Sequence, residues 1–223
     1  MTGDIKRSLL KDIKTEFRNP AALGAAAAFA CITTLTVSIA AGGVPFSPAV
    51  KSILLWVILF FCAMNSLLHV FTREQEEGTA LFLILNVSTD AVFISKLAFN
   101  AALFFLIEFI VCPLFMLFMQ LAPAHFLFFC LTVICGGAAI VSASTMLAAM
   151  TSKAGGKASL FTVIAFPLIL PVLWVAISTT VACLDSASTP AVGNIIFLLA
   201  FSVAIAAMSL LLFKFVWTET NIG

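Results

Sequence analysis

Charge is what this sequence has least of. Asp, Glu, Lys and Arg make up only 9% of its 223 residues, whereas soluble domains carry about 25%. Hydrophobic residues account for 63%, and the mean hydropathy is +1.21. The net charge of +1 indicates neither nucleic acid nor an acidic partner. This composition excludes an ordinary soluble domain and predicts a polytopic membrane protein built entirely from α-helices.

Residues that build metal and redox sites are few, and their spacing does not suit such sites. No C-x-x-C pair occurs among the six cysteines, which lie in or beside apolar runs at positions 31, 62, 112, 130, 135 and 183. We expect them to be small buried hydrophobes. The two histidines, His69 and His125, fall near opposite membrane faces and cannot share a metal ion. His125 alone could be an axial haem ligand, but a structural role is more common.

A nucleotide site is also missing. Residues 154–159 read Ala-Gly-Gly-Lys-Ala-Ser, which resembles a phosphate-binding loop. The motif G-x-x-x-x-G-K-[ST] requires glycine where Thr151 stands and serine or threonine where Ala158 stands. We therefore expect the chain to bind no ATP itself and to be a non-catalytic protein.

Apolar runs long enough to cross a bilayer fill the chain instead. A helical span needs about 20 residues, and no room is left for a second domain. We expect six spans within a transmembrane domain over 21–223, at approximately 21–41, 50–70, 97–120, 125–150, 159–184 and 194–216.

The first 20 residues differ from the rest of the chain. Between residues 4 and 18 an apolar residue recurs every four positions, while basic residues occupy most of the remainder; the apolar positions are Ile5, Leu9, Ile13 and Phe17. This pattern is typical of a helix lying at the membrane surface. We predict an interfacial amphipathic helix within 1–20; a disordered basic leader is the alternative.

Basic residues are divided very unequally between the two ends of the predicted spans. Of the eleven Lys and Arg residues, only Lys51 falls at one side; the other side holds Lys6, Arg7, Lys11, Lys14, Arg18, Arg73, Lys96, Lys153, Lys157 and Lys214. Loops rich in Lys and Arg stay in the cytoplasm. The division predicts that both termini and the segment 71–96 are cytoplasmic.

The segment 71–96 is the longest polar interruption between spans and carries four of the ten acidic residues. Its apolar positions recur at helical spacing, with a possible break at 86–88. We predict two short amphipathic helices on the cytoplasmic membrane face; a solvated loop is the alternative. Such an acidic segment, on a chain without a nucleotide site, fits a transporter subunit that relies on a separate ATPase.

One acidic residue, Glu108, lies in the middle of the third predicted span, where a charged residue costs about 2.5–3.5 kcal/mol. Either it lines a pathway or meets a partner helix, or it is a protonated carboxyl hydrogen-bonded within the bundle. Pro113 follows five residues later and predicts a kink. Pro167 and Pro171 lie on one face of the fifth span, where they either allow bending or accommodate packing.

Four stretches together resemble the cytochrome c maturation protein B family, also called haem exporter protein B. They are LKDIKTEFR at 10–18, EGT at 77–79 followed by Leu81, Leu83 and Lys96, IEFIVCPLF at 107–115, and FPLILPVL at 166–173. The resemblance covers nearly the whole chain, in order and at matching spacing. Two departures occur: residues 86–88 lack the family's usual proline, and Lys153 and Lys157 stand where an arginine is usual.

The resemblance implies a membrane (permease) subunit of an ABC transporter in the bacterial cytoplasmic membrane. Its partners would be an ATPase (the A subunit), a haem-handling membrane subunit with a tryptophan-rich motif (the C subunit) and a small D subunit. ATP hydrolysis on the ATPase would drive release of the haem-loaded chaperone. ATP and haem would bind to partners, since this chain has only three scattered tryptophans, Trp56, Trp174 and Trp217.

The acidic segment of a chain without a nucleotide site predicts that a helix at 74–85 engages the ATPase, and the resemblance strengthens this prediction. The expected coupling residues are Glu74, Glu76, Glu77, Gly78, Thr79, Leu81 and Lys96. Three alternatives from other classes remain at this point. The chain could be a permease subunit of a lipid or drug exporter, a secondary transporter working through Glu108, or a scaffold that only docks other subunits. Copurification of an ATPase would separate the first from the second.

Overall fold

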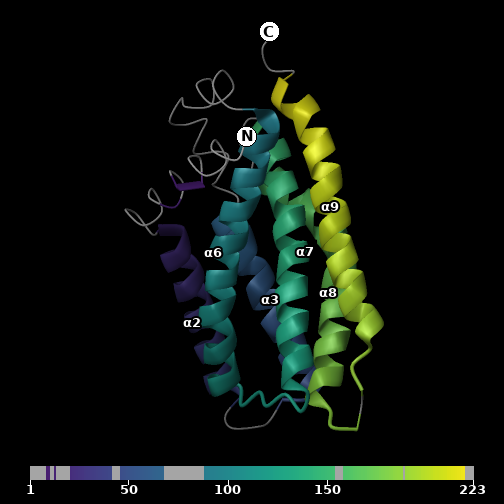
Figure 1. Ribbon diagram of the computed structural model, residues 1–223. Helices are drawn as coiled ribbons and strands as arrows, with labels where there is room; N and C mark the ends of the chain where they lie inside the picture. Colours follow the sequence, from purple (N-terminus) through teal and green to yellow (C-terminus); the bar gives the residue numbers. More distant parts are fainter. Residues whose placement is uncertain are drawn as a thin grey trace.

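The computed structural model describes residues 9, 10, 13, 21–41, 46–67, 88–153, 158–187 and 189–218. The regular elements in this part of the chain are six α-helices, as the composition predicted (Figure 1). They are α2 (Ala21–Ala40), α3 (Pro48–Leu67), α6 (Thr89–Phe118), α7 (Phe126–Lys153), α8 (Ala158–Leu184) and α9 (Val192–Thr218). The prediction of an all-α polytopic membrane protein is confirmed at this level.

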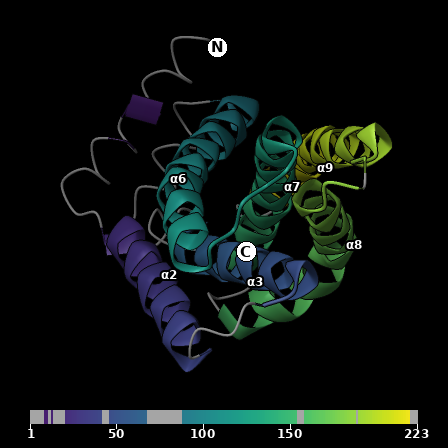
Figure 2. The same cartoon turned by 90° about the horizontal axis from the view of Figure 1, so that it is seen from below.

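The helices run alternately up and down. The beginning of α2 and the end of α9 point toward the same end of the bundle (Figure 1). Seen along the bundle, α7 lies in the middle and packs against α3, α6, α8 and α9, while α2 covers α3 and α6 at one edge (Figure 2). Residues on several faces of α7 are therefore buried, which makes this helix the centre of the fold.

Five of the helices are long and apolar enough to cross a membrane: α3, α6, and the stretches Phe126–Met150 of α7, Pro167–Leu184 of α8 and Val192–Phe213 of α9. The helix α2 contributes a shorter apolar stretch, Ala27–Ala40. Large apolar side chains point outward from these helices, among them Phe109 and Trp174, which are 76% and 77% exposed. An outward apolar surface suits contact with lipid. A sixth span, over α2, stays a prediction.

Polar side chains join the helices to one another inside the bundle. The indole Nε1 of Trp56 in α3 donates to Thr180 Oγ1 in α8 at 2.9 Å, and Asn100 Nδ2 in α6 donates to Thr145 Oγ1 in α7 at 2.9 Å. Asn194 of α9 donates to Thr179 Oγ1 of α8 at 3.0 Å. Hydrogen bonds of this kind between membrane helices contribute about 0.6 kcal/mol on average. They fix which faces meet rather than supply most of the stability.

Lys51 is the single basic residue predicted on its side of the membrane, and the structure gives a reason for its position. At the end of α6, Gln120 adopts a left-handed conformation (φ 49°), and Leu121 N donates to Met116 O at 3.0 Å. This closes the helix as a Schellman turn. The Lys51 ammonium donates to the Gln120 carbonyl at 2.9 Å. A cation at a helix C-terminus is favourable because the carbonyl groups there carry partial negative charge.

The boundary expected between the segment 71–96 and the third span is wrong. The helix α6 begins at Thr89, so residues 89–96 form its first two turns and not a separate surface helix. Ala91, Val92 and Phe93 are all buried, as are Ser95 and Lys96. These consecutive buried positions belong to a helix that is enclosed on several sides, whereas a surface helix would expose one face.

Two other predicted elements lie mostly outside the described residues. The first of the two surface helices expected within 71–96, which precedes the break at 86–88, lies there entirely. Of the interfacial helix within 1–20, the structure describes Leu9, Leu10 and Ile13, all helical. Leu9 and Ile13 pack against the core, and Leu10 is exposed. The stripe at every fourth position thus faces the bundle at these two residues, and the interfacial helix as a whole stays a prediction.

Candidate functional site

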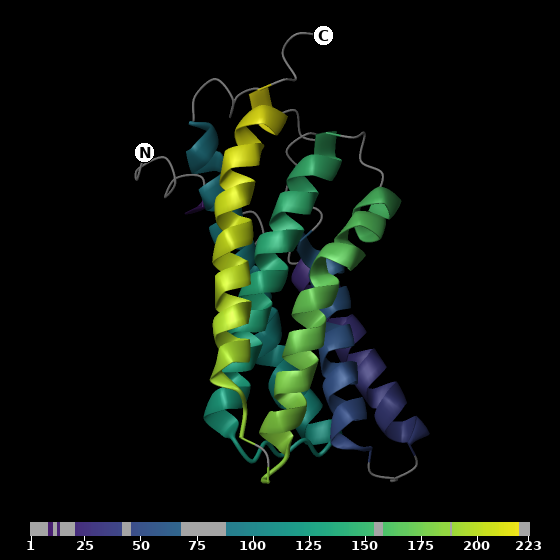
Figure 3. The same ribbon diagram turned by 90° about the vertical axis from the view of Figure 1, so that its right-hand side faces the viewer.

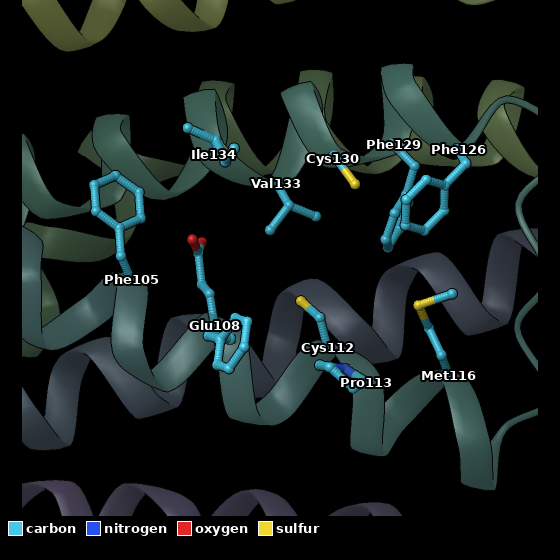
Figure 4. A pocket seen from close by; sticks show the side chains of 11 residues that line it. Phe105, Glu108, Cys112, Pro113, Met116, Phe126, Phe129, Cys130, Val133 and Ile134 are labelled. Atoms are coloured by element: carbon cyan, nitrogen blue, oxygen red, sulfur yellow. The ribbon is translucent and has the colours of Figure 1, made fainter.

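Glu108 is the most unusual side chain of the described part of the chain. It lies within the long helix α6, and it is 4% exposed. Its carboxyl group reaches toward α7, where it lies beside Gly137 (Figure 4). A Cβ atom at position 137 would lie 2.9 Å from Oε2 and closer still to Oε1. The absence of a side chain at Gly137 therefore creates the space that the carboxyl occupies.

The neighbouring residue, Gly136, does the same for another helix. A Cβ atom at position 136 would lie 2.9 Å from Cζ3 of Trp56 and overlap the end of the indole ring. Trp56 is fully buried in α3. The two consecutive glycines thus let α7 approach α3 on one side and α6 on the other. Sequence reasoning missed this pair, although two adjacent glycines inside an apolar run could have indicated close helix packing.

The carboxyl of Glu108 is incompletely satisfied. Among the described residues, its Oε1 atom is buried and has no hydrogen-bond partner. The nearby polar groups considered from the sequence do not supply one: Asn100 donates to Thr145, and Ser142 donates to Ala138 O. Burying a polar group without a hydrogen bond costs about 1–3 kcal/mol. This arrangement needs an explanation from function or from a partner molecule.

A groove lies between α6 and α7 and has Glu108 in its wall (Figure 4). Its volume is about 510 Å³, and it is lined by six residues of α6 between Phe105 and Met116 and by five of α7 between Phe126 and Ile134. Among these lining residues, Glu108 is the only one with a charged or strongly polar group; the others are apolar side chains and two cysteines. We call this the α6–α7 groove.

The proline positions singled out in the sequence face outward. Pro113 is exposed in α6 and lines the α6–α7 groove, and α6 continues through it. Pro167 and Pro171 are both exposed on α8, with Ile169 and Val172 buried on the opposite side. The beginning of α8 leans away from α7 (Figure 3). The two prolines therefore share one face, as their spacing predicted, without ending the helix.

The structure places His125 in a structural setting. It is half-buried just before α7; its backbone N–H donates to Cys183 O at 3.1 Å, and its ring packs edge-on against Phe128. Its partner in the sequence argument, His69, lies outside the described residues. In the described ranges, no group of three or more His, Cys, Asp or Glu side chains is placed to hold a metal ion.

Most of the expected coupling residues also lie outside the described residues: Glu74, Glu76, Glu77, Gly78, Thr79 and Leu81. Lys96 is described, and it is only 2% exposed inside α6. Its part in coupling to an ATPase stays a prediction. The structure brings together Glu108 and Pro113 in one groove wall, while Pro167 and Pro171 belong to a different face.

Comparison with known proteins identifies the family of the chain. The family model described as CcmB protein matches residues 4–217, nearly the whole chain, as the resemblance predicted. The comparison with curated proteins gave no match. The family consists of transporter membrane subunits of the haem-exporter ABC system that serves cytochrome c maturation, and such subunits are generally non-catalytic.

Proposed function

The chain belongs to the CcmB family, and we propose that it connects a separate ATPase to the release of a haem-loaded chaperone. The observation that carries the proposal is the family match over residues 4–217 on a chain without a complete phosphate-binding loop. The partners are an ATPase (CcmA-like), a haem-handling membrane subunit (CcmC-like) and a small CcmD-like subunit. ATP and haem bind to these partners.

The helix α6 is suited to carry movement across the membrane. It begins at Thr89, within the proposed coupling segment 71–96, and its 30 residues span about 45 Å. Its far end is held by Lys51 of α3 and by Ser38 of α2, which donates to Phe118 O at 3.1 Å. A displacement at the start of α6 therefore reaches α2 and α3 at the opposite end of the bundle.

Contact with the ATPase belongs to Glu74, Glu76, Glu77, Gly78, Thr79 and Leu81. Lys96, which is buried at the end of the first two turns of α6, acts from inside the bundle by holding the start of that helix in place. The coupling segment thus consists of an outer part, which meets the ATPase, and the buried first turns of α6, which transmit the movement.

The membrane is the bacterial cytoplasmic membrane, with both termini and the coupling segment in the cytoplasm. Ten of the eleven basic residues support this orientation. The beginning of α2 and the end of α9 point toward one end of the bundle, as this orientation requires (Figure 1). The alternative of a secondary transporter is favoured by one observation only, the buried Glu108 in an open groove.

Copurification tests the proposal. The tagged full-length chain is extracted from its native membranes in mild detergent, and every copurifying protein is identified by mass spectrometry. We expect an ATPase with a complete phosphate-binding loop and a membrane subunit with a tryptophan-rich haem site. Recovery of the intact chain without any ATPase, together with proton-dependent transport by the chain alone, would establish the secondary transporter instead.

A further inference from the structure

A second groove continues the first along the same helix. It has a volume of about 440 Å³ and lies between α6 and α9, with α7 at its floor. Phe105 lines both grooves. The two grooves thus follow one another along α6 from Leu97 to Met116, a rise of about 28 Å, and we refer to them together as the trough. The hydrocarbon core of a bilayer is about 30 Å thick, so the trough has the length of one membrane-spanning helix.

The two halves of the trough differ in side-chain size. Six of the eleven residues that line the half between α6 and α9 are small: Ala101, Ala138, Ser142, Ser202, Ala206 and Ala207. Small residues at a helix surface allow the backbone of another helix to approach closely, which is the usual way in which membrane helices associate. Small residues give a lipid acyl chain no comparable advantage, because an acyl chain has no helix backbone that could pack closely against them.

The other half contains the buried carboxyl. Glu108 lines the α6–α7 groove, and its side chain points into the space between the two helices (Figure 4). Its Oε1 atom is enclosed by the chain and has no hydrogen-bond partner among the described residues, so hydrogen bonding of this carboxyl group is incomplete. An acyl chain cannot donate a hydrogen bond to it. A polar side chain on a neighbouring helix can, and in a medium without water such a bond is the main way to satisfy the carboxyl.

We propose that this trough seats one membrane-spanning helix of a partner subunit, and that this helix presents a hydrogen-bond-donating side chain to Glu108. The proposal rests on the proposed function only in that it requires another membrane subunit beside this chain. A second copy of the chain is a poorer occupant. Its exposed indole donor, Trp174, is on α8, which lies beyond α7 from α6 (Figure 2). If α8 of one copy were seated in the trough of another, two different surfaces of the chain would meet. Two copies related by a two-fold axis instead meet through the same surface on each copy.

Photocrosslinking at two matched positions tests the occupant. Phe109 and Trp174 are 76% and 77% exposed, and each lies about ten residues, or 15 Å, from the end of its helix. Each is replaced in turn by benzoyl-phenylalanine in the complete complex in native membranes. We expect position 109 to form an adduct with another membrane subunit, mapped by mass spectrometry to a single apolar segment with a donor residue. Position 174 should form no adduct with that segment.

Adducts of position 109 with lipid alone, or with a second copy of the chain, would overturn the proposal. Equal adducts with the same segment at both positions would also overturn it, because the contact would then not depend on the trough.

Two variants of Glu108 test the hydrogen bond, with crosslinking at position 109 as the readout. Glu108→Gln keeps an acceptor oxygen, so the adduct yield should stay within about twofold of that of the wild type. Glu108→Leu removes the acceptor and should lower the yield about tenfold. An unchanged yield in the Leu variant would refute recognition through Glu108.

Retention of the ATPase, measured in the same samples, separates this inference from the proposed function. The Leu variant should keep the ATPase, because Glu108 lies in the membrane-spanning part of α6. Loss of the ATPase from the wild-type complex would count against the proposed function and leave the crosslinking result at position 109 interpretable.

Discussion

Glu108 of α6 and Gly137 of α7 share one position in the bundle: the carboxyl of the first occupies the place that a side chain on the second would need. A methyl group at position 137 would overlap both carboxyl oxygens. Because Glu108 is almost fully buried, the carboxyl has little room to move aside. The identity of one residue therefore constrains the other.

Gly137→Ala should destabilise the protein. Insertion of a methyl group into a packed interior costs about 1–3 kcal/mol, and we expect a lower unfolding temperature in detergent. Gly193→Ala is the matched control, because a Cβ atom there meets nothing within 4 Å. Combining Gly137→Ala with Glu108→Ala should recover part of the loss, since the overlapping group is then gone. Strictly additive effects of the two changes would show that the residues are not in contact.

A second prediction concerns the contact of α3 with α8. Trp56→Phe keeps most of the buried ring but removes the donor to Thr180 Oγ1. We expect a loss of about 0.6–1.7 kcal/mol in the free energy of unfolding, since hydrogen bonds between membrane helices contribute about 0.6 kcal/mol on average and at most about 1.7 kcal/mol. Thr180→Val should cost a similar amount, and the double variant little more than either single one. A double variant that loses the full sum would mean that the bond contributes nothing.

Orientation in the membrane gives the third prediction. In a variant without native cysteines, single cysteines are placed at Glu76, in the coupling segment, and at Ser186, in the loop between α8 and α9. An impermeant thiol reagent added to intact cells should label position 186 and not position 76. Disruption of the membrane should make position 76 reactive. Labelling of position 76 in intact cells would reverse the proposed orientation.

The spans were predictable because each must supply about 20 apolar residues. The second run, at 50–70, agrees with α3 at Pro48–Leu67, and the fifth, at 159–184, agrees with α8 at Ala158–Leu184. The start of α6 was not predictable in this way. Asp90 and Lys96 lower the hydropathy of its first turns, and only the packing of the bundle shows that these turns belong to the same helix.

Which face of each helix points inward was harder to derive than the helix itself. In a soluble protein the outer face is polar, but here lipid makes the outer face as apolar as the core. Phe109 is exposed and Ile107 is buried, although both are large and apolar. Glu108 could be singled out from the sequence because a charged residue inside a membrane span is energetically costly. The trough and the role of Gly137 could not, because they depend on how three helices pack together.

The central claim is that the coupling segment transmits the action of the ATPase, and a pair of variants tests it most directly. Replacing Glu77 and Gly78 together, as Glu77→Ala with Gly78→Val, alters the surface proposed to meet the ATPase. Glu74→Lys is the comparison variant and should lower ATPase recovery less than the double variant, because a single surface ion pair contributes about 0–1 kcal/mol. The measurement is the ATPase recovered with the tagged chain, together with the level of c-type cytochromes in the same cells. The account predicts that the double variant stays in the membrane at its normal level but loses ATPase and cytochromes about tenfold, which corresponds to about 1.4 kcal/mol of binding free energy. Wild-type amounts of both in the double variant would contradict it.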